Sequence, residues 1–385
     1  MTVQLRPLAP DEAPAAAAVW LQGRSAAFPA VPAGVHADEE AARWFTEVLV
    51  PAAEVHVAVE EGQVVAVLVL RDDRVDQLYV LPGHTGRGTG SALLALAQER
   101  RPAGLQLWTF QSNVRARAFY ARHGFVEVEA TDGTGNEERA PDVRMVWPGS
   151  GRPQPYEAVA VNLDPQADNR IHDDDVAQRL GFAGALVPGV EVFALASAPL
   201  VAAWGEAFLA AGRLALRFRR PVYDGERVRV EVAGDVLTAT GPDAVVRARG
   251  TAGAPAPPAL LPAPVLGPFG AVALPPDPAA CADYVQRIGE PSRLYRELVH
   301  PGLVLRLVNL ALMSNVALGP WIHTASDCRF LGTARVDEPA EVRSRVTGLY
   351  ARGGHDYVHY DALVLSAGRP VAQVAHEAIW RIAGT

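Results

Sequence analysis

A glycine-rich turn between a predicted strand and a predicted helix constrains this chain more than any other feature. Residues 74–80 alternate as a strand, the segment Thr85-Gly-Arg-Gly-Thr-Gly90 follows, and residues 91–97 form an apolar helical run. Glycines at alternate positions let backbone N–H groups approach a ligand without interference from Cβ atoms. The helix that begins near Gly90 adds unpaired N–H donors and the positive end of its dipole. The pattern predicts an anion-binding cradle between a strand and a helix.

The segments around this cradle predict an α+β domain. Apolar alternation marks the strands, and the Ala-rich helices need a sheet to pack against. In chain order the expected elements are a strand at 3–7, helices at 11–24 and 38–48, strands at 54–60, 63–70 and 74–80, the cradle helix, a strand at 105–110, a helix at 113–120, and strands after 125 and at 142–147.

This part of the chain resembles the Gcn5-related N-acetyltransferases (GNAT). The family's Arg/Gln-x-x-Gly-x-Gly/Ala pyrophosphate loop is matched by the glycine segment, with Thr85 in the place of the leading Arg or Gln. Its Asn-x-x-Ala-x-x-x-Tyr segment is matched by Asn113, Ala116 and Tyr120. The resemblance implies a mixed sheet with flanking helices, acetyl-CoA as co-substrate, no metal, and transfer of the acetyl group to an amine.

The resemblance also implies roles for individual residues. The backbone N–H of Val80 would polarise the thioester carbonyl, and Tyr120 would protonate the leaving thiolate. Asp76 is the expected catalytic base, acting through water, and Glu60 or Glu61 are alternatives. The residues expected to bind acetyl-CoA are Leu78, Val80, Thr85, Gly86, Arg87, Gly88, Thr89, Gly90, Ser91, Asn113 and Ala116.

The acceptor is less defined by the sequence. Gln77, Trp108 and Gln111 are candidates for its side of the site. A small-molecule amine and a peptide amine both remain open, and so does a homodimer.

Composition limits the class of protein. The chain has 385 residues, 49% hydrophobic and 20% charged, which is typical of a soluble protein with two or three domains. Its net charge of -8 argues against a nucleic-acid partner, because phosphate contacts need a basic face. No signal peptide is expected. Cys281 and Cys328 are the only cysteines, which excludes a disulfide framework and an all-cysteine metal site and favours a cytoplasmic location.

Proline and glycine content predicts how the rest of the chain is divided. The expected order is a GNAT domain at 1–148, a linker at 149–155, a unit at 156–252, a Pro/Ala-rich connector at 253–278 and a second unit at 279–385. Strands are expected at 156–162, 214–222, 226–236, 243–251, 327–330, 340–350, 356–366 and 371–382.

Each of these two units contains one long apolar helix that follows a Pro-Gly pair. The helices are expected at 190–211 and 303–318, where Glu191 and Arg306 interrupt the apolar runs and favour burial in a protein over a membrane span. Pro188 precedes Phe218 by 30 residues, and Pro301 precedes Phe330 by 29. This shared spacing predicts a duplicated fold.

A long helix wrapped by an antiparallel sheet is the hotdog architecture. Residues 156–382 resemble two hotdog units in tandem, similar to MaoC-type hydratases and related thioesterases. The hydratase pattern Gly-Asp-x-Asn-Pro-Ile-His is matched at Asn169, Ile171 and His172, but Ala167 replaces the catalytic aspartate. Hydration needs an acid and a base around one water, so we expect acyl-thioester binding with little or no hydration. The candidate residues are Asn169, His172, Gly189 and His300.

Three functions are therefore open. The first is an acetyl-CoA-dependent N-acyltransferase fused to a double hotdog that binds an acyl thioester. The second is a thioesterase or hydratase-like enzyme in the hotdog half, acting on acyl-CoA. In the third, both halves are binding modules that sense acyl-CoA.

Overall fold

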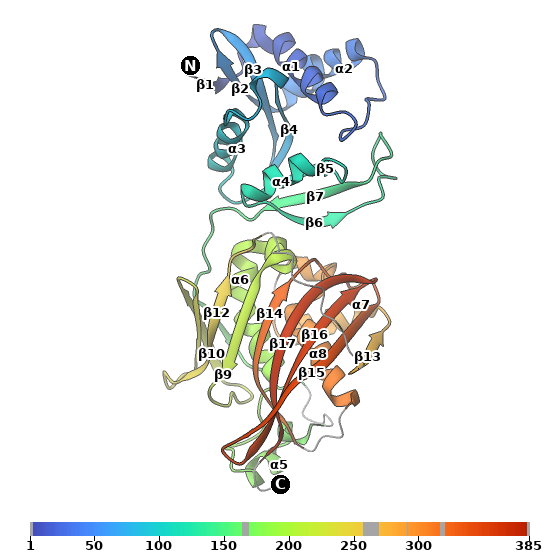
Figure 1. Cartoon of the computed structure of the whole chain (residues 1–385). Helices are drawn as coiled ribbons and strands as arrows, with labels where there is room; N and C mark the ends of the chain where they lie inside the picture. Colours follow the sequence, from blue (N-terminus) through green and yellow to red (C-terminus); the bar gives the residue numbers. More distant parts are fainter. Residues whose placement is uncertain (1–2, 164–168, 257–268, 291, 316–319, 383–385) are drawn as a thin grey trace. The chain divides into compact units, whose positions relative to one another are not determined.

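The computed structural model describes residues 3–163, 169–256, 269–290, 292–315 and 320–382. It divides into two compact units, Met1–Gly151 and Arg152–Thr385 (Figure 1). Each unit has its own sheet and its own hydrophobic clusters. Ala167 and residues 257–268 of the predicted connector lie outside the described residues.

Unit 1 is built on a seven-stranded sheet of order β1-β2-β3-β4-β5-β7-β6. Its strands are β1 (Gln4–Pro7), β2 (Glu54–Glu60), β3 (Gln63–Arg71), β4 (Arg74–Val80), β5 (Leu105–Phe110), β6 (Val126–Ala130) and β7 (Asp142–Trp147), and its α-helices are α1 (Ala13–Ala26), α2 (Asp38–Trp44), α3 (Thr89–Arg100) and α4 (Val114–Arg122). Strands β4 and β5 are parallel, and the other neighbours are antiparallel.

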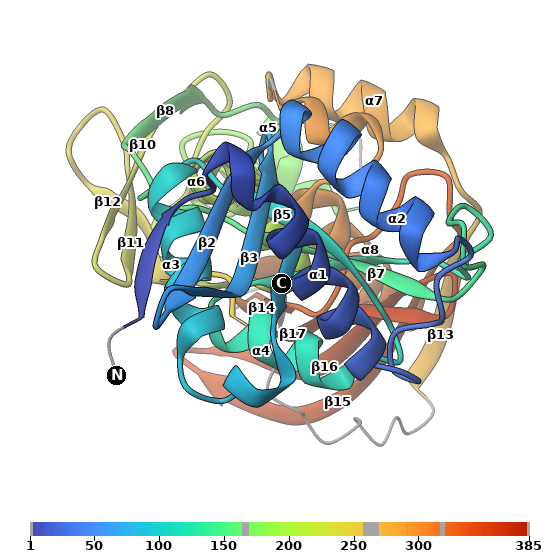
Figure 2. The ribbon, with the colours of Figure 1, turned by 90° about the horizontal axis from the view of Figure 1, so that it is seen from above.

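The two faces of this sheet carry separate hydrophobic clusters. On β3, Leu68 belongs to the cluster that packs Leu93 and Leu94 of α3, whereas its neighbour Val67 belongs to the cluster that packs Trp20 of α1. Successive strand residues point to opposite faces, so the continuous apolar run of β3 is buried on both sides. Helices α1 and α2 contact each other on the second face (Figure 2).

Unit 2 contains a ten-stranded antiparallel sheet of order β13-β15-β16-β17-β14-β9-β12-β11-β10-β8. Its strands are β8 (Tyr156–Val159), β9 (Arg213–Phe218), β10 (Arg227–Ala233), β11 (Val236–Thr240), β12 (Val246–Gly253), β13 (Phe269–Leu274), β14 (Ile322–Phe330), β15 (Ala340–Arg352), β16 (His355–Ser366) and β17 (Arg369–Arg381). Its α-helices are α5 (Asp174–Arg179), α6 (Gly189–Ala211), α7 (Pro278–Arg287) and α8 (Pro301–Asn315).

The topology of unit 2 repeats itself. Taken in chain order, the strands β8 to β12 and the strands β13 to β17 form two five-stranded halves with the same spatial order, which meet where β9 pairs with β14. Equivalent hydrogen bonds precede the two long helices. Val187 N–H donates to the Val222 carbonyl at 2.8 Å, and Val299 N–H donates to the Ala334 carbonyl at 2.8 Å. The spacing of the two Pro-Gly pairs in the sequence reflects this repeat.

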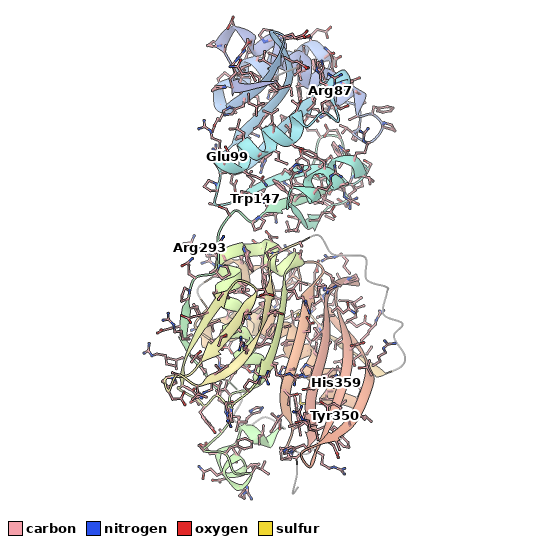
Figure 3. The ribbon with its side chains drawn as sticks, turned by 60° about the vertical axis from the view of Figure 1, so that its left-hand side comes forward. Arg87, Glu99, Trp147, Arg293, Tyr350 and His359 are labelled. Carbon is pink, nitrogen blue, oxygen red and sulfur yellow. The ribbon has the colours of Figure 1, made fainter. Side chains whose placement is uncertain are left out.

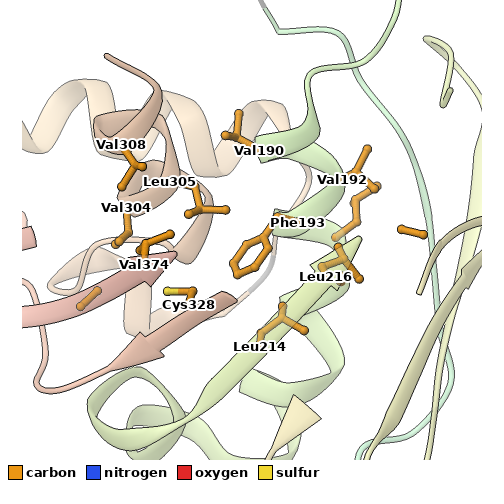
Figure 4. Packing of buried hydrophobic residues seen from close by; sticks show 14 of the residues in the cluster. Val190, Val192, Phe193, Leu214, Leu216, Val304, Leu305, Val308, Cys328 and Val374 are labelled. Atoms are coloured by element: carbon orange, nitrogen blue, oxygen red, sulfur yellow. The ribbon is translucent and has the colours of Figure 1, made fainter. Parts of the chain in front are cut away.

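Helices α6 and α8 lie together against the sheet. Phe193 of α6 is packed among Leu305 of α8, Leu216 of β9 and Cys328 of β14 (Figure 4). By length and composition α6 could cross a membrane, with a mean hydropathy of 1.6, but 72% of that stretch is buried inside the protein. The sheet and α8 therefore cover the apolar surface of α6.

The charges that interrupt the two apolar helices bind each other. The Arg306 guanidinium donates to Oε1 of Glu191, at 2.8 Å from Nε, and stacks over the Tyr284 ring at 5.4 Å from its centroid. Glu191 is almost completely buried. Removing one partner would leave a buried charge uncompensated, so the pair fixes how α6 meets α8.

A second buried carboxylate joins five strands. Glu377 of β17 accepts from Arg217 at 2.6 Å, from Thr324 at 2.6 Å and from Tyr350 at 2.9 Å, and lies 2.6 Å from His359. Tyr350 and His359 are neighbours on β15 and β16 (Figure 3). Burial alone would raise the pKa of Glu377, but these hydrogen bonds outweigh it and lower the pKa to about 2.

Three elements of unit 2 differ from the sequence-based expectation. The strand predicted at 226–236 is a hairpin of β10 and β11, because Gly234 adopts a positive φ of 63° and turns the chain. Strand β13 lies within the predicted connector, paired with β15. Helix α7 was not expected. Asp277 caps it by accepting from the Ala280 N–H at 2.9 Å, and Tyr284 anchors it in the interior.

A substitution at Gly250 of β12 can test the pairing of β12 with β9. A Cβ at this position would lie 1.8 Å from the Ala215 carbonyl oxygen of β9, whereas a Cβ at Gly253 would approach Arg213 Cβ only to 3.5 Å. We expect Gly250→Ala to destabilise the β9–β12 pair by about 1–3 kcal/mol and Gly253→Ala to have little effect. Amide hydrogen exchange in β9 and β12 measures the stability of the strand pair in each variant. Equal protection in the two variants would contradict the expected steric clash at Gly250.

Candidate active site

A large cleft in unit 1 forms where β4 and β5 separate. The two parallel strands share a single register pair, Arg74 with Gln106, near the start of β4. Beyond that pair a cleft of about 820 Å³ opens between them. Strand β4, the glycine segment, β5 and α4 line the cleft. Its volume suits a large, extended ligand.

The separation leaves backbone groups of β4 facing the cleft. Leu81 N–H donates to the Val65 carbonyl at 2.9 Å, so it points toward β3. Successive N–H groups of a strand point to opposite edges, and the N–H of Val80 therefore points toward β5 and the cleft. This is the geometry that an oxyanion-binding donor requires.

The glycine segment forms the end of the cleft where α3 begins. Gly86 and Gly88 have φ values of 76° and 89°, which L side chains rarely adopt, and Gly88 is the N-cap of α3. A Cβ at either position would meet no atom within 4 Å. The glycines are therefore required by backbone conformation, and the surface above them is open to a ligand.

Most of the predicted acetyl-CoA residues line this cleft. The exceptions are Arg87, whose side chain is 56% exposed (Figure 3), and Thr89, which is buried. The predicted residues that do line it are Leu78, Val80, Thr85, Gly86, Gly88, Gly90, Ser91, Asn113 and Ala116.

A buried carboxylate supports the glycine segment. Oε2 of Glu60 lies 2.6 Å from Nδ1 of His84 and 4.0 Å from Nη1 of Arg87. Glu60 at the end of β2 thus anchors the turn that leads into the cradle. Its neighbour Glu61 is an exposed hairpin residue with a φ of 52°. The geometry gives Glu60 a positioning contact, and neither residue is among those that line the cleft.

Helix α4 and its N-cap bring three of the predicted residues to the cleft, namely Asn113, Ala116 and Tyr120. The Asn113 side chain caps the helix by accepting from the Ala116 N–H at 3.2 Å. Two turns later Tyr120 lines the cleft and packs edge-on against Phe119. Burial raises the pKa of the Tyr120 phenol, which keeps it protonated and able to donate.

Asp76 lines the cleft from β4 and binds Arg71. Its Oδ1 accepts from Nη2 of Arg71 at 2.6 Å. Trp108 also lines the cleft. Gln111 is used elsewhere, because its amide donates to the Thr131 carbonyl at 2.8 Å and holds the segment between β6 and β7.

A second cavity of about 780 Å³ adjoins the cleft and was not found from the sequence. Helix α1, the segment between α1 and α2, helix α2 and the segment between β6 and β7 form its walls. Gln77, which accepts from Trp20 Nε1 at 2.9 Å, lines both this cavity and the cleft. So do Arg24 and Glu138, which form an ion pair. These residues come from segments that are distant in the sequence, so they form no motif by which the cavity could have been predicted.

In unit 2 three of the four hotdog candidates surround one small cavity. Asn169, His172 and Gly189 line a space of about 180 Å³ together with Asn309 and His323. The side chain of Asn169 exchanges two 3.0 Å hydrogen bonds with the backbone of Trp321. It therefore links the segment before α5 to the second half of the sheet.

The tautomer of His172 follows from its partners. Its Nδ1 lies 2.7 Å from the Leu186 carbonyl, which can only accept, so Nδ1 carries the proton. In the neutral ring Nε2 is then an acceptor, and the Asn169 amide lies 3.3 Å from it.

His323 was missed by the sequence analysis. It lies 2.8 Å from Ser326 Oγ, which lies 2.9 Å from Nδ1 of the stacked His376. A Cβ at Gly189 would approach Nδ1 of His323 to 2.6 Å, so the helix start can lie against this ring only as glycine. Burial lowers the pKa of His323 to about 3 and keeps the ring neutral.

His300 lies apart from this cavity. Its Nδ1 accepts from the Gly302 N–H at 3.0 Å, and its ring packs against Tyr295 and Tyr284. These contacts assign it to the packing before α8. In the parts of the chain that the structure describes, no group of three or more His, Cys, Asp or Glu side chains could hold a metal ion.

Comparison with known proteins relates part of unit 1 to a family. Residues 51–127 match the family model described as an acetyltransferase (GNAT) domain. Uncharacterized N-acetyltransferases of Mycobacterium tuberculosis and Mycobacterium bovis are each 35% identical over 100 residues, which is 24% of this chain and 64% of theirs. The chain thus spans less than two thirds of the length of these relatives. Residues 51–127 of unit 1 thus correspond to a GNAT acetyltransferase domain.

Solved structures similar to this chain include two further proteins. The apo form of YjaB from Escherichia coli is 22% identical, covers 39% of this chain and 100% of its own, and has a TM-score of 0.34. The PaiA N-acetyltransferase from Thermoplasma acidophilum, in complex with coenzyme A, is 19% identical, covers 38% and 98%, and has a TM-score of 0.30.

Proposed function

We propose that unit 1 transfers an acetyl group from acetyl-CoA to an amine. The observation that carries this proposal is the cleft between β4 and β5, with the glycine cradle at the start of α3 and the edge of β4 along one wall. Open N–H groups at a helix start suit the pyrophosphate of a coenzyme. The part of the cleft between β4 and β5 suits an extended chain that ends in a thioester.

The transfer follows from groups that line the cleft. The neutral amine attacks the thioester carbonyl carbon, and the N–H of Val80 stabilises the charge that develops on its oxygen. The C–S bond then breaks as the N–C bond is completed. Tyr120 donates to the departing thiolate, and the nitrogen loses one proton. The products are the N-acetylated amine and the coenzyme thiol.

The proton of the amine needs an acceptor in the cleft. Asp76 is the proposed relay, because it lies on β4 four residues before Val80 and lines the same cleft. Its carboxylate accepts from Arg71, so a water molecule would connect it to the amine. Glu60 fits this role less well, since it is bonded to His84 outside the cleft lining.

Binding of acetyl-CoA to the cradle can be tested at Gly88. In Gly88→Glu a carboxylate would repel the pyrophosphate, and we expect acetyl-CoA affinity to fall about tenfold or more. Gly88→Gln places a side chain of the same size on the same strained backbone without the charge. Titration calorimetry on the full-length protein gives both dissociation constants. An unchanged affinity in Gly88→Glu would place the coenzyme elsewhere.

The role of Tyr120 predicts a difference between binding and turnover. Tyr120→Phe should lower kcat about 10²-fold while acetyl-CoA affinity changes little, because the phenol acts as charge develops on sulfur. Tyr79→Phe is the matched control, since Tyr79 is a half-buried tyrosine of β4 that also lines the cleft. Thiol release measures turnover. Parent-like turnover in Tyr120→Phe would reduce Tyr120 to a packing residue.

We further propose that unit 2 is a double hotdog that binds an acyl thioester. The support is the repeated five-stranded half, the long helix in each half, and a cavity at the start of α6. The first N–H groups of α6, near Gly189, could bind a thioester carbonyl. His172 and Asn169 adjoin this point. A thioesterase or hydratase-like activity on acyl-CoA is the alternative.

The expected behaviour of unit 2 is binding without hydration, because Ala167 replaces the carboxylate of the hydratase pattern. Losing one of two acid–base groups costs about 10²–10⁴-fold in rate. We expect the full-length Gly88→Glu variant, in which the cradle of unit 1 is blocked, to bind crotonyl-CoA without loss of absorbance of the conjugated thioester. Robust hydration that disappears in His172→Ala would contradict this expectation.

A further inference from the structure

The residues that line the second cavity of unit 1 indicate the chemistry of the acceptor. Four residues line both spaces, so the cavity and the cleft lie next to each other. They are Arg24, Val31, Gln77 and Glu138. The volume of about 780 Å³ lies in the range of sites for small molecules.

The inner wall of this cavity is aromatic. Trp20 and Trp44 have ring centroids 6.1 Å apart, and Trp20 also stacks on Phe45. Trp44 is 41% exposed and Phe28 is 65% exposed, although both are large apolar side chains. Exposed aromatic surface gathered in one hollow indicates an apolar ligand. The body of the acceptor is therefore expected to be aromatic or aliphatic.

The outer part of the cavity is acidic. Glu40 of α2 and Glu137 of the β6–β7 segment approach the same imidazole, with oxygens 3.4 Å from Nδ1 and 3.8 Å from Nε2 of His36. Asp38 also lines the cavity. Glu138, deeper in, is neutralised by Arg24. The negative charge that remains is thus concentrated at the mouth, away from the thioester.

The acidic mouth is held in place by its surroundings. The pair of Arg24 and Glu138 joins α1 to the β6–β7 segment. Within that segment Asn136 donates to the Ala140 carbonyl at 2.8 Å and to Asp142 at 3.0 Å. Glu137 therefore projects from a braced turn rather than from a free loop.

We propose that the acceptor is a small amine with an apolar body and a second positive charge at its far end. The reacting amine would enter the cleft past Gln77, and the body would lie on the Trp20 and Trp44 rings. The far cation would lie beside the exposed carboxylates of Glu40 and Glu137, which flank His36. An aromatic wall also attracts cations through the faces of its rings. This inference rests on the proposed acetyl transfer in unit 1 and names its substrate class.

Three amines that share one aromatic body test the far charge. They are 4-(aminomethyl)benzylamine, benzylamine and 4-(aminomethyl)benzoate, whose far ends are positive, neutral and negative. With the full-length protein and acetyl-CoA, we expect kcat/KM to fall in that order, by about fivefold at each step for exposed charge pairs. Added salt should reduce the differences in kcat/KM among the three amines, because it screens exposed charges.

Matched variants test whether the carboxylates at the mouth of the cavity cause this order of kcat/KM values. The double variant Glu40→Gln, Glu137→Gln should bring the kcat/KM values of the three amines within about twofold of one another. Glu39→Gln is the control, because Glu39 is an exposed carboxylate of α2 that does not line the cavity. A preference for the benzoate, or a series that is the same in the double variant, would overturn the proposal.

Calorimetry with the same amines separates this inference from the proposed function. The dissociation constants of the three amines should follow the same order, and no binding of the dication would overturn the inference even where another amine is acetylated. If the charge order holds but acetyl-CoA neither binds nor releases thiol, the proposed acetyl transfer fails and the cation-binding cavity remains.

Discussion

The cleft of unit 1 depends on the loss of pairing between two parallel strands. β4 and β5 share one register pair and then diverge, so the edge of β4 is left to a ligand. Unpaired backbone groups in a sheet are costly unless another partner binds them. The N–H of Val80 faces this gap, and the glycine cradle and Tyr120 lie around it. The sheet thus sets the position of each proposed catalytic group.

Unit 2 is organised by polar pairs inside an apolar interior. Glu191 binds Arg306 between the two long helices, and Asn169 binds the backbone of Trp321 across 152 residues of sequence. Each group would be destabilising without its partner. Since each partner comes from the other half of the repeat, the two halves are held as one structure. The small cavity at the start of α6 lies beside the second of these pairs.

Local sequence determined much of this protein. The alternation on either side of a glycine-rich turn predicted the strand, cradle and helix of unit 1, because glycine at positive φ and apolar periodicity are local properties. The spacing of Asn113 and Tyr120 placed both on α4. The Pro-Gly pairs predicted a repeat, and the strand order of unit 2 contains one. The match of residues 51–127 to the GNAT model agrees with the first of these patterns.

Contacts between distant segments were decided only by the tertiary structure. Gln111 lies next to β5 in sequence, but its amide is bound to Thr131. The second cavity of unit 1 draws on α1, α2 and the β6–β7 segment, and His323 meets Gly189 from the other half of unit 2. Neither hydrophobic periodicity nor motif spacing predicts contacts of this kind, because each of these residues forms no recognisable motif within its own segment. The sequence determined most of the elements and the glycine-rich turn, and packing determined which side chains share a cavity.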